Sequence, residues 1–403
     1  MIKKVTSVLF ILVLALFIVG CGSKDIKETT PNKEEKKDTP VVEAIEDKVN
    51  KQMSEMTLDE KIAQMLVIYY LSPIADDDLL NVIKTYSPGG FIMMLDNYST
   101  FDDTKKFIDI LKQNSKIPMI ISTDEEGGLV QRLKTLTDVE VTDIPPMYDV
   151  GKTGDLSKAK EVAKVLAEEL RTLGINVTYA PDTDIWTNPD NTVIGDRAFG
   201  TDATTVSNMA IAFNQSLEEN GIMGCFKHFP GHGDTLADSH YSLPVVNKTY
   251  EDIKSLELIP FQKAIENGAK MIMVGHIALP NITGDDTPAS LSKKIITDIL
   301  KTDMNYKGLV ITDALNMGAL TENYTDEEIV TKAVNAGADL LLMPNGTAKT
   351  IEYIKNNISE DRINESVKKI LMYKYTYLKD YKYLDKTTLG SDEHKSIINS
   401  IYE

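Results

Sequence analysis

The chain alternates short runs of apolar residues with longer segments in which apolar residues recur every three or four positions. The first pattern indicates buried strands, and the second indicates amphipathic helices. Eight apolar runs, each bounded by Gly, Pro or Asp, lie at residues 64–70, 90–95, 118–123, 176–181, 222–228, 271–276, 308–313 and 339–344. We therefore expect eight strands with helices between them.

Two of the helical segments are especially clear. In residues 157–173 the apolar residues fall on one helical face, Ser157 is placed to cap the start, and Gly174 stands where a helix commonly ends. Residues 359–378 have the same character and are expected to form the last amphipathic helix.

Strands that are apolar throughout, each followed by a helix, favour a parallel sheet that is buried on both faces. Eight such units predict a single closed (β/α)8 barrel of the TIM type over residues 45–383. A doubly wound open sheet is the structural alternative. The polar residues favour the barrel, because they follow several different strands: Asp124, Asp184, Lys227, His228, His276 and Asp313.

The N-terminus has the pattern of a bacterial export signal. Lys3 and Lys4 precede an apolar run from Val8 to Val19, and the segment ending in Gly20-Cys21 resembles the lipobox of bacterial lipoproteins. This resemblance implies a signal peptide over residues 1–20, lipidation of Cys21 and an extracytoplasmic location on the cell membrane. An ordinary cleaved signal or an uncleaved anchor is the alternative.

Polar segments flank the predicted barrel. Residues 21–44 lack aromatic residues and mix charged residues with Thr and Pro, so we expect a flexible tether. Residues 384–403 are expected to form a polar C-terminal tail.

Composition narrows the class of protein. The 403 residues include 43 Lys+Arg and 61 Asp+Glu, for a net charge of −18, which argues against nucleic acid as a partner. Cys21 and Cys225 are the only cysteines, so a disulfide framework and a cysteine zinc module are excluded. Cys225 lies in an apolar stretch and is interpreted as a small buried thiol.

Three of the five histidines, His228, His232 and His240, lie within residues 227–240, KHFPGHGDTLADSH. Proline and glycines prevent this segment from forming one helix, so it is expected to be a functional loop after a strand. The histidines and aspartates could bind a divalent metal. Alternatively, one histidine could transfer protons, because Asp238 stands two residues before His240 and could orient its ring.

Four motifs resemble glycoside hydrolase family 3, and specifically its β-N-acetylglucosaminidase branch. They are STDEEGGLVQRL (residues 122–133), VIGDRAFG (193–200), KHFPGHGDTLADSH (227–240) and ITDALNMGAL (311–320). They occur in the family's order, and the resemblance extends from about Met56 to Tyr377.

The resemblance implies a retaining, exo-acting glycosidase. Asp313 corresponds to the nucleophile, and His240, with Asp238 as its partner, corresponds to the acid/base in place of the usual second carboxylic acid. The residues that correspond to sugar-binding positions are Asp124, Arg132, Arg197, Lys227 and His228. The two arginines could instead be structural ion-pair partners.

The implied substrate is a glycan or muropeptide with a terminal N-acetylglucosamine. No cofactor, metal or nucleic acid is implied, the membrane is reached through the lipid on Cys21, and we expect a monomer. The chain departs from the family pattern at Asp182 and Thr183, where apolar residues are usual, and at Ala314, where a polar residue is common. No room remains for the second domain that many family members carry, so one barrel domain is expected. A metal-dependent barrel hydrolase and a non-catalytic sugar-binding lipoprotein are the competing interpretations.

Overall fold

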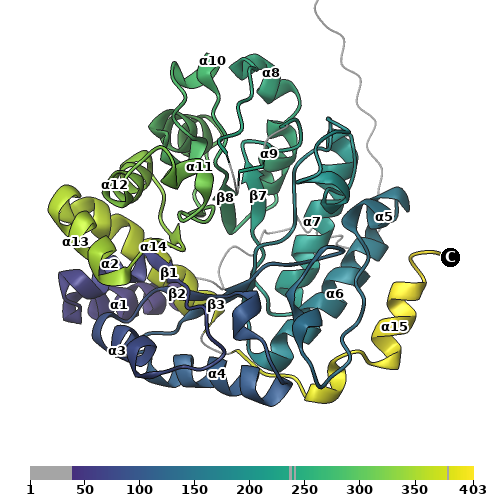
Figure 1. The fold of residues 1–403 in the computed structure, drawn as a ribbon, viewed down its shortest axis with the longest axis horizontal. Helices are drawn as coiled ribbons and strands as arrows, with labels where there is room; N and C mark the ends of the chain where they lie inside the picture. The colour runs from purple at the N-terminus through teal and green to yellow at the C-terminus, as the bar shows by residue number, and fades with distance from the viewer. Residues whose placement is uncertain (1–38, 236–237, 240–241, 379–380) are drawn as a thin grey trace, which may run out of the picture. The chain divides into compact units, whose positions relative to one another are not determined.

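The computed structural model describes residues 39–235, 238–239, 242–378 and 381–403. The expected signal peptide, residues 1–20, and Cys21 lie outside these ranges. Residues 43–403 form one compact unit. Its strands lie at the centre, and its helices surround them (Figure 1).

Eight parallel strands form two sheets. The five-stranded sheet has the order β10-β1-β2-β3-β6, and the three-stranded sheet has the order β7-β8-β9. Their bounds are β1 Leu66–Ile68, β2 Gly90–Met93, β3 Ile120–Thr123, β6 Val177–Thr178, β7 Phe226–Phe229, β8 Met271–Val274, β9 Leu309–Thr312 and β10 Leu341–Leu342. Each of the eight expected apolar runs contributes one of these strands.

Isolated parallel bridges join the edges of the two sheets. Val177 pairs with Met223 on the β6 side, and Ile311 pairs with Leu340 on the β10 side. The fold is therefore an α/β fold of parallel strands, and this strand order is consistent with a TIM-type barrel. The structural alternative, a doubly wound open sheet, would require a strand order different from the one observed.

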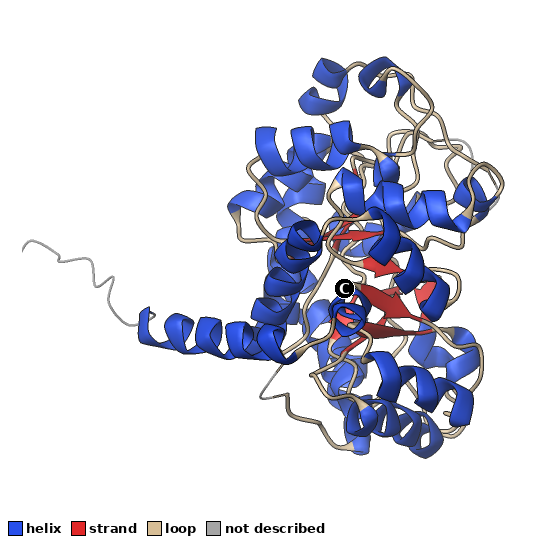
Figure 2. Cartoon of the chain, turned by 90° about the vertical axis from the view of Figure 1, so that its left-hand side faces the viewer, coloured by secondary structure: helices blue, strands red, loops and turns tan. Residues whose placement is uncertain are grey.

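Helices cover the outer face of the strands (Figure 2). Their bounds are α1 Thr39–Glu55, α2 Leu58–Gln64, α3 Asp77–Tyr86, α4 Phe101–Asn114, α5 Met147–Lys152, α6 Leu156–Leu173, α7 Ala203–Glu219, α8 Tyr250–Ser255, α9 Leu258–Glu266, α10 Pro280–Thr283, the π-helix η5 Lys294–Asp303, α11 Gly318–Thr321, α12 Asp326–Ala336, α13 Thr347–Asn357, α14 Glu360–Tyr377 and α15 Asp392–Asn399. Short elements in the loops are η1 Leu95–Asn97, β4 Glu125–Gly127, β5 Val130–Gln131, η2 Arg132–Thr135, η3 Gly195–Arg197, η4 Ala289–Leu291 and η6 Lys386–Thr388. None of the helices in the described part of the chain is both long enough and apolar enough to span a bilayer.

Helix α6 confirms the clearest helix prediction and corrects its first residue. The helix begins at Leu156, because the side chain of Asp155, not Ser157, accepts the hydrogen bond that caps it. It ends as expected at Gly174, whose φ of 91° is readily adopted only by glycine. The apolar residues of the predicted face are buried against the rest of the fold.

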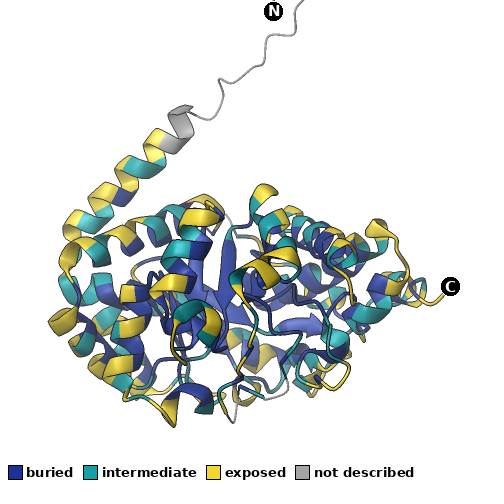
Figure 3. Ribbon diagram, turned by 90° about the horizontal axis from the view of Figure 1, so that it is seen from above, coloured by how far each residue is buried: buried dark blue, intermediate teal, exposed yellow. Residues whose placement is uncertain are grey.

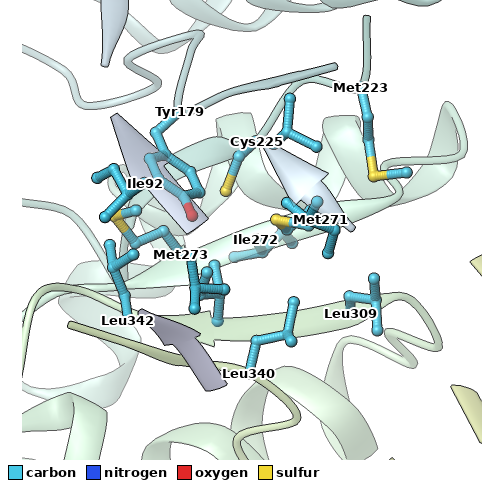
Figure 4. Close-up of a cluster of buried hydrophobic side chains, with 14 of the residues drawn as sticks. Ile92, Tyr179, Met223, Cys225, Met271, Ile272, Met273, Leu309, Leu340 and Leu342 are labelled. Atoms are coloured by element: carbon cyan, nitrogen blue, oxygen red, sulfur yellow. The ribbon is translucent and has the colours of Figure 1, made fainter. Parts of the chain in front are cut away.

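The core lies between and inside the strands, where buried residues gather at the centre of the molecule (Figure 3). Side chains from strands on opposite sides of the fold meet there, including Ile92 of β2, Met271 of β8 and Leu309 of β9 (Figure 4). Cys225 belongs to this cluster and is a free, fully buried thiol, as predicted. Burial raises the pKa of this thiol, so it is held in its neutral form.

Both flanking segments contain more structure than the sequence predicts. Helix α1 begins at Thr39, so the end of the expected tether at residues 39–44 is helical. The expected polar tail carries α15, where His394 lies between Glu168 Oε2, at 2.9 Å, and Glu169 Oε1, at 3.1 Å. Polar composition did not reveal this docking, because the contacts use one buried histidine and a few apolar residues such as Ile398.

Candidate active site

The sequence-predicted residues converge on a cavity of about 380 Å³ at the carboxyl ends of the strands. Asp124 follows β3, Lys227 and His228 belong to β7, and Asp313 follows β9. The polar residues that line the cavity are Asp124, Glu126, Arg132, Arg197, Lys227, His228, His232, Ser239, Asp313 and Asn316. Thus all five expected sugar-binding residues and the expected nucleophile share one cavity.

Glu126 organises the cations of this cavity, although the sequence analysis gave it no role. Its carboxylate receives two hydrogen bonds from Arg197, from Nε at 2.8 Å and Nη2 at 2.9 Å. Lys227 Nζ lies 2.5 Å from Glu126 Oε1 and 3.0 Å from Asp124 Oδ1. The only sequence signal for Glu126 was its place in the motif that contains Asp124.

The charges of this cluster are stabilised by one another. Burial by itself raises the pKa of Glu126, but the adjacent Arg197 and Lys227 outweigh it and hold the net pKa well below its usual range. Burial lowers the pKa of Lys227, whereas Glu126 and Asp124 raise it to a net value above normal. The cluster therefore presents ionised donors and acceptors to the cavity at neutral pH.

Asp184 orients His228 of β7 and His232 of the loop that follows β7. Its Oδ2 lies 2.7 Å from His228 Nδ1, and its Oδ1 accepts a 2.6 Å hydrogen bond from the backbone N–H of His232. Because Asp184 engages Nδ1 of His228, the Nε2 side of that ring is left to the cavity. His232 contacts Thr235 through Nδ1, at 2.6 Å, and burial lowers its pKa to about 4.

Asp313 is half-buried in the cavity wall. The N–H of Ala314 donates a 2.8 Å hydrogen bond to its Oδ1. Burial by itself raises the pKa of the Asp313 carboxyl, but positive charge from His276 and then His228 outweighs it. The net pKa is below the ordinary value, so Asp313 is ionised at neutral pH and can act as a nucleophile.

The loop that carries the expected acid/base reaches this cavity. Ser239 lines the cavity, and its carbonyl accepts a 3.2 Å hydrogen bond from the N–H of Ala319, in α11. Asp238 directly precedes Ser239, and His240 lies outside the described residues.

The two arginines differ in their partners. Arg197 has the ion pair that the sequence analysis considered as an alternative, and it still lines the cavity. Arg132 is placed by the hairpin β4–β5, where Glu125 accepts hydrogen bonds from the backbone N–H groups of Arg132 and Leu133. Within the described ranges, the buried Nε of Arg132 has no hydrogen-bond partner.

The metal set considered from the sequence is not assembled among the described residues. Asp234 pairs with Lys248 at 2.8 Å. The one described group with suitable spacing is Asp182, Asp184 and His228, each of which offers an atom within 4.8 Å of the others. In this structure, however, His228 Nδ1 is hydrogen-bonded to Asp184, and Arg197 Nη2 lies 3.6 Å from Asp182.

Trp186 does not belong to the cavity lining. Its ring packs edge-to-face against Tyr148, with 5.3 Å between the centroids. This position gives no support to a role for Trp186 in stacking on a sugar.

Comparison with known proteins identifies the same family as the motifs. Residues 57–372 match the model of the glycosyl hydrolase family 3 N terminal domain. The chain is 34% identical over 289 residues to the beta-hexosaminidase LpqI of Mycobacterium tuberculosis, covering 70% of this chain and 72% of that protein. It is 33% identical over 287 residues to beta-hexosaminidase A of Pseudoalteromonas piscicida, covering 66% of this chain but only 47% of the relative.

A solved structure is similar to this chain in its fold. The glycoside hydrolase family 3 beta-N-acetylglucosaminidase from a Paenibacillus species superposes with a TM-score of 0.80 at 33% identity. The match covers 86% of this chain and 68% of that one.

Proposed function

Because the chain belongs to glycosyl hydrolase family 3, we propose that it is a retaining, exo-acting β-N-acetylglucosaminidase that removes terminal N-acetylglucosamine from cell-wall-type glycans or muropeptides. The observation that carries the proposal is the ionised Asp313 carboxylate in a small polar cavity with Asp124, Lys227 and His228. The names of the relatives, beta-hexosaminidase and beta-N-acetylglucosaminidase, support the substrate class.

In the first step, Asp313 attacks the anomeric carbon as the bond to the leaving oxygen breaks. His240, in its protonated form, gives its proton to that oxygen, and Asp238 orients the ring and favours the protonated state. The products of this step are the free aglycone alcohol and a covalent glycosyl-enzyme on Asp313.

In the second step, water replaces the aglycone. The neutral His240 removes a proton from the water molecule, whose oxygen attacks the anomeric carbon and releases the Asp313 carboxylate. Two displacements on the same carbon return the sugar with its original anomeric configuration.

The remaining cavity residues hold the sugar. Asp124, Arg132 and His228 offer acceptors and donors for directional hydroxyl groups, and the ion-paired Arg197 and Lys227 are fixed in place by Glu126. A cavity of about 380 Å³ suits the end of a glycan rather than its middle, which supports exo action.

We extend the proposal to architecture and location. The two sheets and their bridging pairs support one closed TIM-type barrel. We propose that this barrel works as a monomer, and the two steps above use no cofactor. The lipobox pattern at Cys21 supports an extracytoplasmic enzyme held on the cell membrane by lipid.

The decisive experiment is hydrolysis of p-nitrophenyl N-acetyl-β-glucosaminide with and without a chelator, with the first-formed anomer followed by NMR. The proposal requires turnover that resists the chelator and releases the β-anomer first. Loss of activity with chelator would favour a metal-dependent hydrolase. Binding of N-acetylglucosamine without turnover would favour a sugar-binding lipoprotein.

A further inference from the structure

His276 is a fully buried histidine beside the cavity to which neither the family motifs nor the proposed reaction assigns a role. It follows β8, two residues beyond Val274. Its Nε2 lies 2.9 Å from the carbonyl oxygen of Ala314, and its Nδ1 lies 2.8 Å from Ser290 Oγ. The ring therefore links the segment after β8 to the residue directly after Asp313.

The chemistry of these contacts defines the proton on the ring. A carbonyl oxygen only accepts, so Nε2 of His276 must carry a hydrogen and donate it to Ala314. In the neutral ring, Nδ1 then accepts the hydrogen bond from the Ser290 hydroxyl. Ser290 is itself fully buried, and its backbone N–H is bonded to Gly275 O at 3.2 Å.

Ala314 lies between two residues whose N–H groups are held by neighbouring strands, and its carbonyl oxygen also accepts a 3.2 Å hydrogen bond from the N–H of Met317. The N–H of Asp313 donates to Val274 O at 2.9 Å, and the N–H of Leu315 donates to Leu342 O at 2.8 Å. Between these anchors, the N–H of Ala314 donates to Asp313 Oδ1. Any rotation of residue 314 would therefore move the carboxylate oxygen that its N–H holds.

We propose that His276 is a positioning residue for the nucleophile: supported by Ser290, it holds Ala314 so that Oδ1 of Asp313 is fixed by a backbone N–H and Oδ2 is left to attack the sugar. This inference rests on the proposed function, because it assigns the attack to Asp313. In the protonated ring, Nδ1 donates to Ser290 Oγ instead, and the charge of the ring then lowers the pKa of the Asp313 carboxyl. A misplacement of about 1 Å at a reacting atom can cost about 10²-fold in rate.

The test uses the full chain with three variants and an activated substrate. His276→Leu removes the donor to Ala314, and His276→Gln keeps a donor near the position of Nε2. Ser290→Ala removes the hydrogen bond to Nδ1 of His276. The leaving group of a dinitrophenyl N-acetylglucosaminide needs little protonation. Its single-turnover rate therefore reports the attack by Asp313 rather than proton donation by His240. Affinity for N-acetylglucosamine, measured by calorimetry, reports the rest of the cavity. His394→Gln, at a buried histidine on α15, is the matched control.

We expect the single-turnover rate to fall about 10²-fold in His276→Leu while the affinity for N-acetylglucosamine stays within about threefold of wild type. His276→Gln should recover most of the rate, Ser290→Ala should lose part of it, and His394→Gln should match wild type. A rate close to wild type in His276→Leu would overturn this inference and leave the proposed function standing. The same conclusion would follow if His276→Gln were as slow as His276→Leu and its affinity were unchanged. If His276→Leu does not fold, the other two variants decide in the same way. An inactive wild-type chain would overturn the proposed function and this inference with it.

Discussion

Lys227 Nζ lies 2.5 Å from Glu126 Oε1, and this contact joins β7 to a residue of the short strand β4 that is 101 positions earlier in the chain. The same carboxylate binds Arg197 through two nitrogens. One buried anion thus holds two cations of the cavity in place.

Glu126→Gln should lower kcat/KM for p-nitrophenyl N-acetyl-β-glucosaminide by about 10²-fold or more. An amide cannot neutralise two cations, and breaking a buried ion pair typically costs about 3–5 kcal/mol. Steady-state kinetics measures the loss. Glu140→Gln, at a largely exposed carboxylate, is the control, and equal kinetics for the two variants would contradict the role assigned to Glu126.

Asp313→Asn should abolish turnover and leave the fold and most of the affinity for N-acetylglucosamine intact. The neutral amide cannot form the covalent intermediate, but it occupies the same volume. Circular dichroism, calorimetry and kinetics test the three parts, with Asp102→Asn on the surface of α4 as the control. Activity within about tenfold of wild type would show that another group is the nucleophile.

His240→Ala should slow substrates with poor leaving groups by about 10²- to 10⁴-fold and a dinitrophenyl glycoside far less. The reason is that a dinitrophenolate leaves without a proton. Asp238→Ala should show the same pattern more weakly, because the ring remains but is poorly oriented. An equal loss on both substrates, with rescue by added zinc, would indicate a metal ligand instead.

Glu125→Gln should stabilise the protein at alkaline pH. Burial raises the pKa of Glu125 to about 8, although the backbone N–H groups of Leu133 and Arg132 act in the opposite direction. In the unfolded chain the carboxyl ionises near pH 4.5, so the stability of the wild type falls as pH rises from there to about 8. Glutamine does not titrate and keeps an acceptor for both N–H groups.

At about 1.4 kcal/mol per pKa unit, the stability gain of Glu125→Gln at pH 8.5 should exceed that at pH 4.5 by more than about 2 kcal/mol. Urea unfolding of both proteins at the two pH values measures the difference. A gain that does not change with pH would mean that Glu125 is ionised in the folded protein.

Cys21→Ala should move the protein from the membrane to the soluble exported fraction without changing the kinetics of the catalytic domain. A lipid on Cys21 would supply the membrane affinity, and the substitution removes its attachment point. Fractionation and immunoblotting give the result. Membrane retention of the variant would identify the apolar run as the anchor.

The sequence by itself determined the elements and the chemistry that follow from local pattern. All eight apolar runs contain strands, and residues 156–173 and 360–377 are helices close to the predicted ranges. These elements could be predicted because a strand buried on both faces is apolar throughout, and an amphipathic helix repeats its apolar residues every 3.6 positions. The motifs also identified Asp124, Arg132, Arg197, Lys227, His228 and Asp313, which share one cavity.

Only the tertiary structure decided which side chains hold these residues in place. Glu126, Asp184 and His276 act through contacts between residues far apart in the chain, and such contacts depend on how the strands are ordered. The docking of α15 has the same origin: His394 becomes buried only because Glu168 and Glu169 of α6 lie opposite it. The sequence alone does not show whether a polar residue faces water or a buried partner. A polar side chain can be buried only where the fold places a hydrogen-bond or ion-pair partner next to it, because burial without a partner is unfavourable.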